Sequence, residues 1–209
     1  MTWHVDHPTL RPLTVRQAAA VYGGLVASDA SLAAGVAGAG AVHVAAYGAP
    51  LAIALGRVPA DACYCATAAE VHALLVAVRL ARAVGTPRTL CTDATSVVTA
   101  LHATKHGYAH SAVSVECASG SWHELLRELA DGEWTVLHTR PYGPADRAAR
   151  EARQAGLPSV AVELLAVVGD THKQVLAQLQ PLYSRPYVRW GIRTPRRRKR
   201  PHHSLEASL

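Results

Sequence analysis

Apolar residues in the first third of the chain come in short segments separated by glycine-containing turns. Segments of this kind, bounded by turn residues, predict β-strands at residues 22–27, 42–47 and 51–57. The first turn is expected at residues 38–40 and the second at residues 48–50. Because the connections are short, the three strands are predicted to pair as an antiparallel meander.

The spacing of apolar residues changes to that of a helix after residue 66. Within residues 67–84, one helical face carries the larger apolar side chains, and Gly85 ends the pattern. Shorter patterns further along predict strands at residues 89–92 and 134–139, and helices at residues 94–103, 122–130 and 146–155.

This order of elements predicts an α/β fold with a mixed five-stranded sheet: three antiparallel strands, then strands linked through helices, with helices on both faces. One domain is expected over residues 21–156, after a lead-in of residues 1–20 with a short helix at 14–21. A helical extension at residues 157–184 and a basic, disordered tail at residues 185–209 are expected to follow.

The positive charge of the chain is concentrated in this tail. The formal net charge is +6, and eight of the 21 Lys and Arg residues lie within residues 185–200. Clustered arginines attract phosphates, and aromatic side chains among them can stack on bases. A solubilising terminus is the alternative. The predicted nucleic-acid-binding residues are Arg189, Trp190, Arg193, Arg196, Arg197, Arg198, Lys199 and Arg200.

Composition bears on the compartment and on a membrane. Residues 30–56 contain no charged side chain, a length that could span a bilayer, but five glycines and Pro50 favour strands over a membrane helix. The four cysteines have no paired metal-ligand spacing, and we expect them to be reduced thiols of a cytoplasmic protein. They are Cys63, Cys65, Cys91 and Cys117.

Four acidic residues lie where a predicted strand ends or a predicted helix begins. Asp29 and Asp93 follow strands, Glu70 lies in the first turn of the long helix, and Asp146 begins the last helix. Each also has a structural interpretation. Asp29 suits a turn, Asp93 suits a helix cap, and Asp146 suits the positive end of a helix dipole. Glu70 could form a capping box with Thr67.

In a mixed sheet with this strand order, the four positions converge on one edge. Carboxylates brought together repel one another unless a cation neutralises them. Oxygen ligands suit Mg²⁺ or Mn²⁺, and two such ions can activate water and stabilise the leaving oxygen in phosphodiester hydrolysis. The predicted cofactor is therefore a pair of Mg²⁺ or Mn²⁺ ions.

Taken together, residues 25–31, 67–75, 90–98 and 145–149 resemble the ribonuclease H family. They match, in order, its first-strand Asp, first-helix Glu, fourth-strand Asp and last-helix Asp. The resemblance implies an endonuclease that hydrolyses the RNA strand of RNA–DNA hybrids. It also implies the roles of the ligands. Asp29 and Asp93 hold both ions, Glu70 orients the first ion's waters, and Asp146 completes the second site.

Several features depart from the family pattern. Ala30 follows Asp29 where the family usually has Gly, and no basic, Trp-rich substrate handle is recognisable. The loop at residues 140–144 lacks the histidine that many members carry, so His138 in the neighbouring strand is the candidate for assisting product release or for a structural role. Two other functions therefore stay open. One is a catalytically inactive module that binds nucleic acid or protein, and the other is a DNA nuclease such as a junction resolvase.

Overall fold

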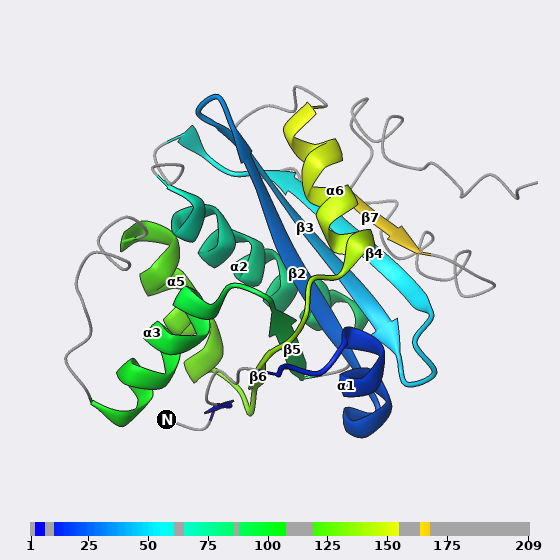
Figure 1. The fold of residues 1–209 in the computed structure, drawn as a ribbon. Coiled ribbons are helices and arrows are strands. Elements are labelled where there is room, and N and C mark those ends of the chain that lie inside the picture. The colour runs from blue at the N-terminus through cyan, green and yellow to red at the C-terminus, as the bar shows by residue number, and fades with distance from the viewer. Residues whose placement is uncertain are drawn as a thin grey trace, which may run out of the picture.

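A seven-stranded mixed sheet forms the centre of the structure, a computed structural model that describes residues 3–6, 11–60, 65–85, 88–107, 119–154 and 164–167. The strands lie in the order β1-β6-β5-β2-β3-β4-β7 (Figure 1). Strands β2, β3 and β4 form the antiparallel meander, β5, β6 and β1 continue parallel to β2, and β7 is antiparallel to β4. Their bounds are β1 His4–Val5, β2 Gly24–Ala33, β3 Val36–Ala45, β4 Pro50–Arg57, β5 Thr89–Thr92, β6 Thr135–His138 and β7 Leu164–Val167.

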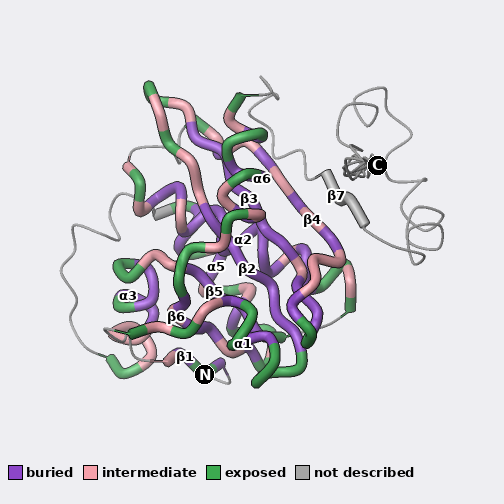
Figure 2. The backbone as a smooth tube through the Cα atoms, turned by 45° about the vertical axis from the view of Figure 1, so that its right-hand side comes forward, coloured by how far each residue is buried: buried purple, intermediate pink, exposed green. Residues whose placement is uncertain are grey.

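Helices cover both faces of the sheet, as predicted. One face packs against α2 (Ala66–Val84) and α3 (Thr95–His106), and α5 (Ser119–Ala130) packs against α2, with Leu74 and Leu125 fully buried. The other face packs against α1 (Val15–Tyr22) and α6 (Gly143–Gln154), which cover apolar side chains of β2 and β3. The central strands β2 and β3 are mostly buried, as their purple colour shows in Figure 2.

The mixed α/β sheet is confirmed, but strands β2 and β3 are longer than predicted. Gly38 and Gly40 lie inside β3, and the turn falls at Ala34 and Gly35, whose φ angles are 49° and 72°. Residues 36–41 are almost all alanine and glycine, so they show no alternation of apolar and polar side chains that would predict a strand. Their strand character is set by tertiary packing against α6.

The described residues before β2 belong to the folded layers. Thr14 caps α1 through a capping box with Gln17, and α1 ends at Gly23 in the left-handed region. Strand β1 pairs with β6 and adds the strand that the predicted five-stranded sheet lacked on that side.

Strand β7 adds the seventh strand, at the opposite edge. It is the described part of the predicted helical extension, so these four residues form a strand and not a helix. The rest of the predicted helical extension and the basic tail lie outside the described residues. Among the described helices none could cross a membrane, and the uncharged residues 30–56 form the meander.

Candidate metal centre

Asp29 lies in the middle of β2, not at its end as predicted. Its side chain follows the alternation of Leu25 and Ala27, which face the layer of α1 and α6. The residue is only 8% exposed. Asp29 pairs with Gly40 of β3, so it lies inside the sheet and the turn interpretation is excluded.

Glu70 lies in the second turn of α2, and one of its carboxylate oxygens lies within 4.8 Å of one from Asp29. Helix α2 begins after Cys65, which makes no side-chain capping bond, so the capping box of Thr67 and Glu70 is not formed. Instead the Thr67 hydroxyl lies 3.5 Å from Ser96 Oγ. Glu70 Oε2 is buried and has no hydrogen-bond partner. A buried carboxylate oxygen without a partner is costly, which indicates that a ligand belongs there.

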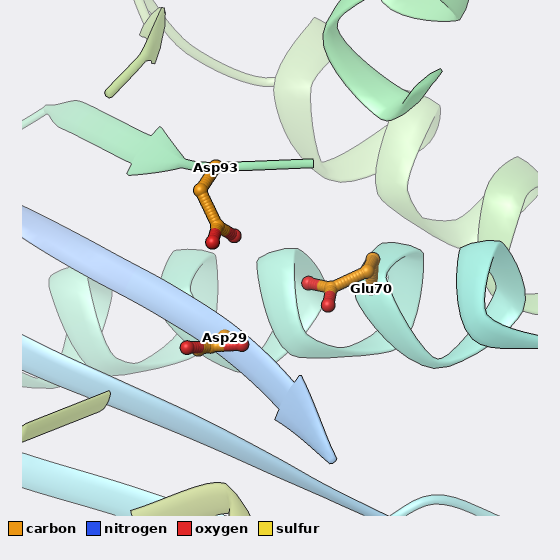
Figure 3. A group of neighbouring side chains, drawn as sticks. All are labelled: Asp29, Glu70 and Asp93. Carbon is orange, nitrogen blue, oxygen red and sulfur yellow. The ribbon is translucent and has the colours of Figure 1, made fainter. Parts of the chain in front are cut away.

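Asp93 follows β5 in the connection to α3. It is not the helix cap, because α3 has Ala94 at its N-cap position without a side-chain bond. The backbone amide of Ala94 donates to Thr92 Oγ1 at 3.1 Å, which shapes this connection locally. The carboxylate of Asp93 points from the end of β5 toward α2 (Figure 3).

The structure brings Asp29, Glu70 and Asp93 together. One carboxylate oxygen from each lies within 4.8 Å of the other two. Figure 3 shows the three side chains coming from β2, α2 and the end of β5 into one space. None of the ion pairs between described residues involves these three carboxylates. Three oxygen donors at this spacing fit one divalent cation.

The electrostatics of the three carboxylates favour a bound cation. Burial, together with the charges of Asp93 and Asp146, raises the pKa of Asp29 to about 7. Burial raises the pKa of Glu70 to about 8, with Asp29 and Asp93 adding to the effect. The pKa of Asp93 is also raised, again chiefly by burial. A hydrogen bond from the Ala30 backbone opposes the shifts at Asp29 and Glu70 but does not cancel them.

Asp146 is outside this group of three but electrostatically coupled to it. It lies in the first turn of α6 and accepts a hydrogen bond from Arg150 Nε at 2.8 Å. Its charge still raises the pKa of both Asp29 and Asp93. The sequence therefore predicted four carboxylates at one point, and the structure places three there with the fourth beside them, paired with Arg150.

His138 ends β6 beside Asp93, so its position next to the carboxylates follows from the parallel pairing of β5 with β6. It is paired in register with Thr92, and its positive charge, when present, lowers the pKa of Asp93. Its Nε2 lies 3.1 Å from Thr95 Oγ1, and its Nδ1 is buried without a partner.

No known family and no curated protein matches the sequence. Among solved structures, RNase H1 from the halophilic archaeon Halobacterium salinarum NRC-1 is 19% identical with a TM-score of 0.46, over 62% of this chain and 96% of that chain. An N-terminal RNase H domain from Mycobacterium tuberculosis, solved as a fusion with maltose-binding protein, is 18% identical with a TM-score of 0.47, over 62% and 94%. LC11-RNase H1, solved with an RNA/DNA hybrid, is 15% identical with a TM-score of 0.50, over 65% and 99%. The chain has a ribonuclease H-like fold.

Two contacts of this ribonuclease H-like fold were missed from the sequence. Arg150 pairs with Asp146, and the spacing of four residues on a helix is a signal that could have shown it. Thr95 orients His138 from 43 positions away, and no local pattern connects them. The predicted nucleic-acid contacts of the tail lie beyond the described part of the chain.

Proposed function

We propose that the protein is a metal-dependent endonuclease that hydrolyses the RNA strand of RNA–DNA hybrids. The observation that carries the proposal is the group of three carboxylates, which offers oxygen atoms within 4.8 Å of one another and contains the unpartnered Glu70 Oε2. The fold supports the assignment, because the neighbour LC11-RNase H1 was solved with an RNA/DNA hybrid.

Each carboxylate has a distinct task in this proposal. Asp29, Glu70 and Asp93 would hold a divalent ion, Mg²⁺ or Mn²⁺, and Asp29 and Asp93 with Asp146 would hold a second. Bound ions of this kind supply the positive charge that activates a water molecule and stabilises the leaving oxygen. For this, the second ion would replace Arg150 as the partner of Asp146. The replacement would cost little, because exposed ion pairs such as this one contribute little free energy.

His138 is the proposed auxiliary group. The Thr95 hydroxyl fixes the imidazole ring through Nε2, while Nδ1 has no partner of its own. A proton on Nδ1 would lie near the carboxylate of Asp93, whose pKa the charge of His138 lowers. The proposed task is to donate that proton to the departing product.

The test compares cleavage of a labelled RNA–DNA hybrid, duplex DNA and duplex RNA in Mg²⁺ and in Mn²⁺. We expect cuts in the RNA strand of the hybrid and their loss in Asp93→Asn, because an amide cannot replace the carboxylate charge. Asp131→Asn is the matched control. Asp131 is a largely exposed aspartate paired with Arg82, far along the chain from the group.

Each result separates the proposed function from its rivals. Cleavage of duplex DNA in preference to the hybrid would identify a DNA nuclease on the same fold. Binding of the hybrid without any cleavage, in either metal, would identify an inactive binding module. If Asp93→Asn cut as fast as the wild type, the site assignment would be wrong.

A further inference from the structure

The first half of α6, which carries Asp146, lies directly on the backbone of β3 (Figure 1). A Cβ atom on Gly40 would lie 2.6 Å from the backbone nitrogen of Ala149 and closer still to the carbonyl oxygen of Ala145. Such contacts are shorter than real Cβ atoms make, so any side chain at position 40 must move the helix.

Helix α6 comes equally close to β3 at Gly38, two residues before Gly40. A Cβ atom on Gly38 would overlap the carbonyl oxygen of Ala149 and the backbone nitrogen of Arg153. Two residues of a strand span about 6.7 Å and four residues of a helix rise about 6 Å, so the two glycines meet successive turns of α6. Gly40 therefore supports the turn that carries Asp146, and Gly38 supports the opposite half of the helix.

Gly40 is also the strand partner of Asp29. Directly paired residues of an antiparallel ladder point to the same face of the sheet, so position 40 faces α6 beside the Asp29 carboxylate. Ala145, at the contact point, immediately precedes Asp146. Gly40 is thus in contact with both the strand that carries Asp29 and the turn of α6 that carries Asp146.

We propose that Gly40 is a positioning residue for the candidate metal centre, because its missing side chain sets the distance between Asp146 and Asp29. This inference rests on the proposed function. A methyl group at position 40 would lift the first turn of α6 from the sheet and withdraw Asp146 from the other carboxylates. A methyl group at position 38 would lift the far half of the helix and leave Asp146 nearly in place.

The experiment measures Mn²⁺ binding by loss of the free-ion electron paramagnetic resonance signal, in Gly40→Ala and in Gly38→Ala. We expect the half-saturating Mn²⁺ concentration to rise at least tenfold in Gly40→Ala and less than threefold in Gly38→Ala. Asp146→Glu lengthens the carboxylate side chain. Added to Gly40→Ala, it should lower the half-saturating Mn²⁺ concentration at least threefold. In the wild type Asp146→Glu should not increase Mn²⁺ affinity, because the aspartate side chain already reaches the ion.

The outcomes distinguish this inference from the proposed function. Equal losses in the two glycine variants, or no rescue by Asp146→Glu, would overturn the role of Gly40 while leaving the proposed function intact if Asp93→Asn still abolishes binding. A wild type that binds no Mn²⁺ would overturn both. Should Gly40→Ala not fold, adding Ala148→Gly removes the side-chain contact at 2.9 Å. If that variant also fails while Gly38→Ala folds, Gly40 serves folding alone and the inference is wrong.

Discussion

Removing one carboxylate should stabilise the metal-free protein and, at the same time, abolish its stabilisation by metal. Asp29→Asn is the most informative change, because Asp29 is buried and couples to the charges of Asp93 and Asp146. The raised pKa of Asp29, about 7 against an ordinary 3.8, means that its charged form is destabilised in the folded state. The folded protein therefore binds protons that the unfolded chain has released, and its stability falls as pH rises from about 4 to about 7.

The magnitude follows from the pKa of Asp29. A shift of about three pKa units corresponds to about 4 kcal/mol, an upper limit because neighbouring carboxylates and solvent respond when the charge is removed. We expect a gain of about 1–3 kcal/mol in the free energy of unfolding at pH 8 without metal. For a chain of this size that is about 3–10 °C in Tm.

Thermal unfolding followed by circular dichroism, in EDTA and in Mg²⁺ or Mn²⁺, measures both effects. The wild type should lose stability between pH 5 and pH 8 in EDTA and regain it with metal. Asp29→Asn should show a flatter pH dependence and little response to metal. Asp131→Asn should behave as the wild type. A lower Tm for Asp29→Asn than for the wild type at pH 8 in EDTA would refute the electrostatic account of this site.

Two further predictions concern the groups around the carboxylates. His138→Ala should lower kcat about 10- to 100-fold in assays of hybrid cleavage while Mn²⁺ affinity stays within about twofold, since a proton donor acts on turnover and not on metal binding. An unchanged kcat would leave His138 a structural residue. Truncation after Tyr183 should weaken hybrid binding and flatten its dependence on salt, measured by fluorescence anisotropy, with the same cleavage products, because fewer counterions are released. An unchanged salt slope would show that the tail makes no phosphate contacts.

The sequence predicted the elements whose patterns are strong and missed those whose positions depend on distant contacts. Helix α2 and strand β5 fall almost where their spacing placed them, because large apolar residues mark their buried faces. Strand β3 begins six residues earlier than predicted, because alanine and glycine carry little signal and the closeness of α6 determines the strand. Strand β1 has two residues and is defined only by its pairing with β6.

The candidate site was predicted in its residues but not in its geometry. All four acidic residues could be named from their places beside strands and helices, yet the spacing could not show that Arg150 engages Asp146. Nor could it show that Asp29 lies inside a strand, since that depends on how far β2 extends beyond Ser28. The capping alternative for Glu70 was excluded only when α2 proved to start at Ala66.

Both borders of the sheet are made by segments from outside the span that carries the carboxylates. Strand β1 covers β6 on one side, and β7 covers β4 on the other. A shortened chain limited to residues 21–156 would leave the amide and carbonyl groups of β6 and β4 open along both margins. Open edges of this kind recruit strands from other molecules, so these short flanking strands protect the sheet against self-association.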